Sequence, residues 1–208
     1  MRCRNRIRVW ALIGAMVILQ LVLIVAGSAA AVLDLNRSLT GDFAFTEIVV
    51  CVSSKVPNSD GIDNTTFQLL EDATTNTSTV QGIIRFNGDG TGSIVSFRSV
   101  VINHSTTADG DRPVSQTEGT CDLTYTVSPD NSFVQSHVCA GTVLAGSGVG
   151  NTFTLTNAEF EGQIIPGGKS FVFHTTIPNV ETLTINPLIP GPFFERVCGR
   201  SGTAMKIR

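Results

Sequence analysis

The sequence of 208 residues lacks the motifs that mark most catalytic and metal sites. It has three histidines, none of them in a zinc-binding spacing such as HExxH, and it has no CxxC pair. The GxSxG pattern of a nucleophilic serine is also absent. Two carboxylate pairs, at 159/161 and 109/111, have an i, i+2 spacing that is ordinary on a solvated strand or in a turn. We therefore predict no catalytic residue, no metal site and no cofactor.

Clusters of basic residues are absent after the N-terminus. The formal net charge of −3 includes four arginines among the first eight residues, so the remainder of the chain carries −7. Such a protein has no cluster of basic residues that could bind a nucleic acid or an anionic membrane surface. We therefore expect neither as a partner, and we expect membrane contact only if the N-terminal segment is retained.

That N-terminal segment has the three parts of a secretory signal. The arginines are followed by an apolar run over residues 9–27 and then by small residues ending at Ala31. We predict a signal peptide over 1–31, a single β-barrel domain over 32–208, and a secreted or periplasmic location. The alternative is an uncleaved anchor, because about 20 apolar residues can also span a bilayer and would hold residues 9–31 in the membrane.

A helical period is absent after the signal, and strand patterns take its place. Period-two alternation, β-branched and aromatic residues, and Gly- or Asn-bearing turns predict about eight to ten strands. The expected strands cover 43–52, 80–86, 93–103, 121–128, 132–144, 152–165, 170–177, 180–185 and 193–207, with long loops over 53–79 and 104–119. Successive hairpins favour an all-β, antiparallel up-and-down barrel, and the alternative is a β-sandwich.

The clearest hairpin lies between Cys121 and Cys139. Residues 129–131, Pro-Asp-Asn, suit a three-residue hairpin loop, which places Ser128 opposite Ser132. In that register the two cysteines face each other, close enough for a disulfide. Once Cys3 is set aside with the signal, the remaining pair is Cys51 with Cys198, which would join the first strand to the last. The alternative for these residues is two free buried thiols.

The same register gathers three polar side chains on the side of the two cysteines. His137 faces Leu123, and Gln135 faces Tyr125. If this side is the barrel interior, the lumen contains an imidazole, an amide and a phenol, which need hydrogen-bond partners. Tyr125, Gln135 and His137 are therefore the candidate ligand-binding cluster. The alternative is that they bond to one another or to water.

Four stretches carry a resemblance to known proteins: GDFAFTEIVVCV, FNGDGTGSI, CDLTYTVSPD and RVCGRSGTAMKI. With these the chain resembles a loose group of signal-bearing secreted bacterial proteins. The shared motifs are turns and cysteines, so the resemblance implies a fold and no activity. In architecture alone the chain is also similar to calycin-type and allene-oxide-cyclase-like barrels, which bind or isomerise apolar molecules.

These observations favour an exported, non-enzymatic protein that binds a small apolar ligand in the barrel lumen. Two alternatives stay open. One is a cyclase- or isomerase-like enzyme that uses a lumen histidine or tyrosine as acid or base. The other is a structural or adhesive extracellular module with no small-molecule site. A cavity in the lumen would favour the binding protein or the enzyme, and a fully packed lumen would favour the structural module.

Overall fold

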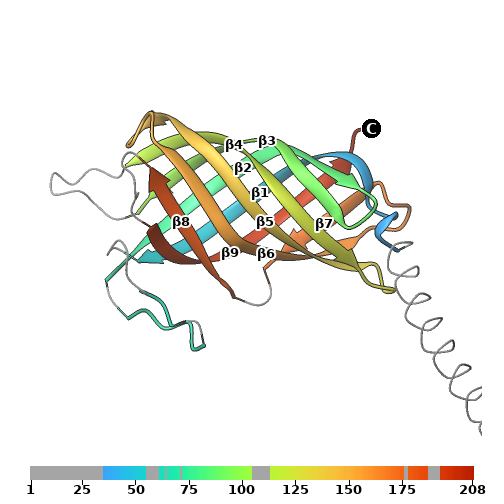
Figure 1. Cartoon of the computed structure of the whole chain (residues 1–208), viewed down its shortest axis with the longest axis horizontal. Coiled ribbons are helices and arrows are strands. Elements are labelled where there is room, and N and C mark those ends of the chain that lie inside the picture. Colours follow the sequence, from blue (N-terminus) through green and yellow to red (C-terminus); the bar gives the residue numbers. More distant parts are fainter. Residues whose placement is uncertain are drawn as a thin grey trace, which may run out of the picture.

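The computed structural model describes residues 35–54, 61–63, 65–70, 72–104, 113–175, 178–186 and 193–208. Within these ranges nine antiparallel strands form one sheet, and pairing of the first strand with the last closes it into a ring (Figure 1). The strands are β1 (Thr40–Ser54), β2 (Ala73–Asn87), β3 (Thr91–Asn103), β4 (Val114–Val127), β5 (Ser132–Gly146), β6 (Thr152–Ile164), β7 (Ser170–His174), β8 (Val180–Asn186) and β9 (Phe193–Lys206).

The closed ring confirms the predicted all-β antiparallel barrel and disfavours the sandwich, which would leave two separate sheets. The predicted signal segment and its cleavage site lie outside the described residues. In the described part of the chain, no helix has the length and apolar character needed to cross a membrane.

The strands β7 and β8 together fill one position in the ring. Both pair antiparallel with β6 on one side and β9 on the other, β7 near one end of the barrel and β8 near the other. They therefore run in the same direction, as one strand interrupted between His174 and Val180. The described barrel thus has eight strand positions, a size whose interior is filled by side chains or holds one small ligand.

Two strands begin seven residues earlier than the sequence pattern predicted. Strand β2 starts at Ala73 and β4 at Val114, so the predicted loops over 53–79 and 104–119 were too long. The extra residues of β2 are mostly Thr, Asn and Ser, which show no apolar alternation. They are nonetheless strand because β1 continues to Ser54 and pairs with them residue by residue.

The predicted central hairpin and its disulfide are confirmed. Ser128 donates its backbone N–H to Ser132, and Asn131 has a φ of 65°, the left-handed conformation that closes the turn. Cys121 pairs with Cys139 in the ladder and is bonded to it. The second disulfide joins Cys51 of β1 to Cys198 of β9, across the seam of the barrel. Two disulfides indicate an oxidising compartment, extracellular or periplasmic.

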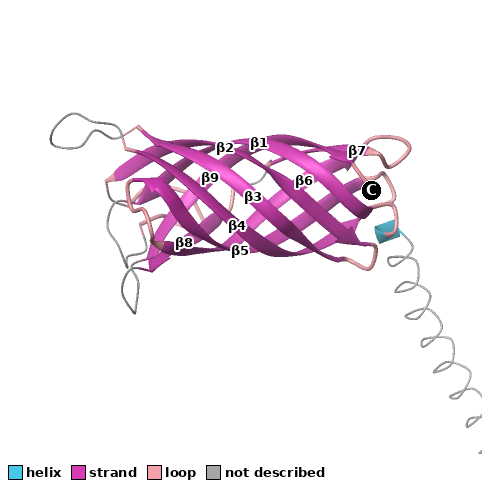
Figure 2. Ribbon diagram, turned by 90° about the horizontal axis from the view of Figure 1, so that it is seen from above, coloured by secondary structure: helices cyan, strands magenta, loops and turns pink. Residues whose placement is uncertain are grey.

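One end of the barrel is filled by aromatic rings. It is the end where the C-terminus lies and where short hairpins join the strands (Figures 1 and 2). Phe43, Phe86, Phe133 and Phe171 are at most 1% exposed there, and Phe171 lies 5.2 to 5.7 Å from the other three rings. We call these four residues the aromatic plug. It closes this end of the barrel to solvent.

Glycines on neighbouring strands make room for the inward aromatic side chains. A Cβ at Gly162 would lie 2.3 Å from the Phe133 ring, and one at Gly202 would lie 2.3 Å from the Phe173 ring. The same pairing of an inward phenylalanine with a glycine directly across the ladder recurs at Phe45/Gly82, Phe97/Gly119 and Phe153/Gly141. These glycines allow the rings to lie against the barrel wall, which leaves space at its axis.

Candidate functional site

The half of the barrel beyond the aromatic plug contains a cavity of about 550 Å³. This volume lies within the range of about 300–1,000 Å³ that is common for small-molecule sites. The cavity extends to the opposite end of the barrel, where its lining is polar and comes from the ends of several strands and from the β5–β6 turn: Ser54, Thr74, Asn103, Ser115 and Asn151. We call this end the mouth.

Between the plug and the mouth the wall of the cavity is mainly apolar. Its side chains come from strands around the whole ring, because alternate residues of each strand point inward. They include Val49, Val80, Ile94, Phe97, Val101, Val143, Phe153, Leu155, Leu183, Ile185 and Phe194. Such a surface fits the apolar part of a ligand.

Gln135 and His137 line the cavity and occupy the next two inward positions of β5 after Phe133 of the aromatic plug. They are 2% and 3% exposed, and they stand two residues apart on the inward face of β5. Gln135 Oε1 and His137 Nε2 are both buried, and neither has a hydrogen-bond partner among the described residues. The His137 ring lies 4.5 Å from the Phe160 ring. We call Gln135 and His137 the polar pair.

The pKa of His137 is lowered to about 3, first because burial penalises the charged imidazolium and second because Arg200 is nearby. The imidazole is therefore neutral over the physiological range. One of its nitrogens carries a proton and the other does not.

Tyr125, the third residue of the predicted cluster, faces the interior but does not line the cavity. Its ring packs 4.9 Å from Phe86 of the plug. The hydroxyl lies within hydrogen-bond distance of the carbonyls of Asn36 and Leu39, at 3.1 and 2.9 Å, and it accepts the N–H of Gly88. The structure thus brings Gln135 and His137 together at the cavity and places the phenol at the closed end.

A buried group of four charged side chains also lies in the lumen, and it was not among the residues predicted from the sequence. Arg200 of β9 donates to Glu47 Oε1 at 3.3 Å, and it forms a forked pair with Glu181, with Nε at 3.1 Å from Oε1 and Nη2 at 2.6 Å from Oε2. Arg196 donates to Glu181 at 2.9 Å. Two arginines and two glutamates make this charged cluster neutral when all four are ionised.

A signal for this cluster was present in the sequence. Glu47 stands in the run FAFTEIVV at the same parity as Phe43, Phe45 and Val49, which are inward positions of β1. A charged residue on the apolar face of a strand is rare unless it is paired. The partners could not be found, because they lie more than 130 residues away on the last two strands.

The two carboxylates of the charged cluster respond differently to burial. Burial raises the pKa of Glu47, and Arg200 offsets only part of this effect. Burial also acts on Glu181, but the adjacent guanidinium groups of Arg200 and Arg196 outweigh it and lower the pKa of that carboxyl. Glu181 is therefore the firmly ionised anchor of both arginines.

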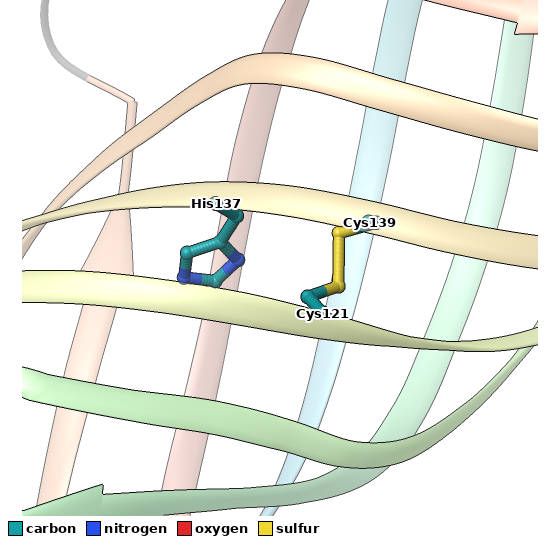
Figure 3. A group of neighbouring side chains, drawn as sticks. All are labelled: Cys121, His137 and Cys139. Carbon is teal, nitrogen blue, oxygen red and sulfur yellow. A yellow bond between two sulfur atoms is a disulfide. The ribbon is translucent and has the colours of Figure 1, made fainter.

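Cys121, Cys139 and His137 are close enough together to suggest a metal site (Figure 3). Their potential ligand atoms lie within 4.8 Å of one another, and no other group of this kind occurs in the described ranges. The two sulfurs, however, are bonded to each other and carry no thiolate charge. In the oxidised protein the group therefore offers one imidazole and no thiolate ligand.

Comparison with known proteins gives no relative: no protein family, curated protein or solved structure matches the chain.

Proposed function

We propose that this protein is an exported, non-enzymatic binding protein that carries one small, largely apolar molecule in its barrel lumen. The observation that carries the proposal is the cavity of about 550 Å³, plugged by aromatic rings at one end and lined by polar strand ends at the other. Ligand sites in eight-position barrels have this form, with apolar walls and a few convergent polar groups.

Binding has more support than acid–base catalysis. A general acid or base works best when its pKa is near the working pH, and burial holds the pKa of His137 at about 3. Burial raises the pKa of Tyr125, and its hydroxyl lies against backbone groups outside the cavity. The other alternative, a structural or adhesive module, predicts a fully packed lumen and does not explain this cavity.

The first test is native mass spectrometry of the protein purified from its own host. We expect a fraction of the protein to carry a small molecule that organic extraction removes. As a quantitative assay, the extracted protein is titrated with N-phenyl-1-naphthylamine, an uncharged dye whose fluorescence rises in apolar surroundings. Saturable binding of one dye per chain is the expected result.

Two neighbouring residues of β2 supply a matched pair of variants for the dye assay. Ser78 lines the cavity, and Thr79 is exposed on the outer face. Ser78→Phe should fill part of the lumen and weaken dye binding about tenfold or more, which is ~1.4 kcal/mol. Thr79→Phe adds a ring outside the barrel and should leave binding unchanged. Equal dye affinity in both variants, with melting temperatures like the parent, would place the dye outside the lumen and contradict the proposal.

A further inference from the structure

The polar pair at the inner end of the cavity is unsatisfied within the described protein. Gln135 Oε1 and His137 Nε2 are buried without a hydrogen-bond partner among the described residues, and both side chains line the cavity. A buried polar atom without a partner costs about 1–3 kcal/mol. The two atoms belong to residues on the same face of one strand, so one group in the cavity can serve both.

The chemistry of the two atoms selects the group. Gln135 Oε1 is a hydrogen-bond acceptor and needs a donor. The neutral imidazole of His137 offers either a donor or an acceptor at Nε2, depending on its tautomer. A hydroxyl group has one donor and two acceptor sites, so it can satisfy both atoms at once. An ionised carboxylate has acceptors alone and would leave the Gln135 oxygen without a donor.

The charged cluster argues against a charged ligand. The guanidinium of Arg200 is already bound to two carboxylates, and Arg196 is bound to Glu181. An anionic ligand would compete with Glu47 and Glu181 for these arginines, and a cationic ligand would compete with the arginines for the two carboxylates. An unpaired charge in such an enclosed site is costly. A neutral head group avoids both penalties.

We propose that the ligand is a neutral amphiphile whose hydroxyl group binds to Gln135 and His137, with its apolar part along the cavity wall toward the mouth. This inference rests on the proposed binding function and adds the class of ligand and its orientation. The hydroxyl enters first and lies against the aromatic plug. The apolar part is then in contact with the side chains of the wall.

The test compares three ligands with the same ten-carbon chain in a dye-displacement assay at pH 7.5. Decan-1-ol has a hydroxyl, decyl methyl ether has an acceptor but no donor, and decanoate is charged. We expect decan-1-ol to bind about fivefold to tenfold more tightly than the ether, which corresponds to ~1–1.4 kcal/mol, and decanoate to bind most weakly. Equal affinity of alcohol and ether, or tighter binding of decanoate, overturns the inference.

The double variant Gln135→Leu/His137→Leu assigns the preference to the polar pair. We expect it to bind the ether as tightly as the parent does and to lose the preference for the alcohol. Thr117→Val is the control, because it removes a hydroxyl from another position in the lining with little change in shape. It should keep the preference. A preference that survives in the double variant overturns the assignment.

The outcomes also separate this inference from the function on which it rests. If the dye and the ether bind in the lumen but the alcohol has no advantage, the binding function stands and water satisfies the polar pair. If neither the dye nor any ten-carbon ligand binds, the proposed function and the inference fail together. The melting temperature of each variant shows that a loss of binding is not a loss of folding.

Discussion

The buried neutral state of His137 predicts how acid should destabilise the barrel. In the unfolded chain a histidine binds a proton with a pKa near 6.5, whereas burial beside Arg200 lowers the pKa of His137 to about 3 in the folded protein. The contribution of this residue to stability is therefore fully present above pH 6.5. It is lost progressively as the pH falls from 6.5 toward 3, because the unfolded state then binds the additional proton.

The size of the effect follows from the two pKa values. Each pH unit between them costs about 1.4 kcal/mol, so lowering the pH from 7 to 4 should remove about 3 kcal/mol of folding free energy through His137. The full difference, reached below pH 3, is about 5 kcal/mol. These losses are large compared with a typical folding stability of about 5–15 kcal/mol.

Urea unfolding of the parent protein and of His137→Leu, with both disulfides intact, measures this effect between pH 7 and pH 4. Other titrating groups, including Glu47 and Glu181, occur in both proteins, so their contributions largely cancel in the difference. We expect the stability of the parent relative to the variant to fall by about 3 kcal/mol over this range. The exposed His174 provides the control, and His174→Leu should follow the pH profile of the parent. Parallel profiles for the parent and His137→Leu would refute the reasoning.

Three further predictions concern stability. Replacing both cysteines of the β1–β9 disulfide by alanine should cost about 5 kcal/mol of folding stability, and the same change in the β4–β5 disulfide about 3 kcal/mol. The difference follows from the lengths of the loops that they close, 147 and 18 residues. A larger loss of stability for the β4–β5 variant in urea unfolding would contradict this. Arg200→Met should cost about 3–5 kcal/mol by leaving two buried carboxylates short of a partner; a melting temperature within about 2 °C of the parent would show that the cluster does not need it. Gly202→Ala should cost about 1–3 kcal/mol of folding stability because the added methyl group meets the Phe173 ring. Gly199→Ala, where no atom lies closer than 4.0 Å, should be tolerated. Equal stability of the two variants by calorimetry would show that the glycine is not required by the Phe173 ring.

The parts of the fold that depend on local sequence could be predicted. The turn at 129–131 sets the register of the β4–β5 hairpin, and that register places Cys121 opposite Cys139 and puts Gln135 and His137 on the inner face. With Cys121 paired to Cys139, only Cys51 and Cys198 were left to form the second disulfide. That pairing indicated that the first and last strands are neighbours. These predictions needed no knowledge of the three-dimensional structure beyond the period of a strand.

The parts that depend on distant packing could not be predicted. The position of Tyr125 relative to the cavity depends on where the lumen is filled, and this is set by phenylalanines from β1, β2, β5 and β7 that meet at one end. The sequence places Tyr125 on the correct face of its strand but contains no local signal for depth along the barrel axis. The early starts of β2 and β4 were missed for a related reason, because Thr- and Ser-rich segments become strand by pairing with a neighbour.

The charged cluster is best understood as part of the wall of the barrel. Strand β9 closes the ring, and its Arg200 reaches β8 on one side through Glu181 and β1 on the other through Glu47. Strand β8 is one segment of the interrupted strand, so it has fewer ladder partners than a continuous strand would provide. The arginine thus braces the ring at its weakest position, and its donors are engaged there. The polar pair on β5 lies near this arginine, since the His137 ring and the Arg200 guanidinium both pack against Phe160. Unlike Arg200, Gln135 Oε1 and His137 Nε2 have no partner among the described residues and line the cavity, and it is there that we expect the polar end of a ligand.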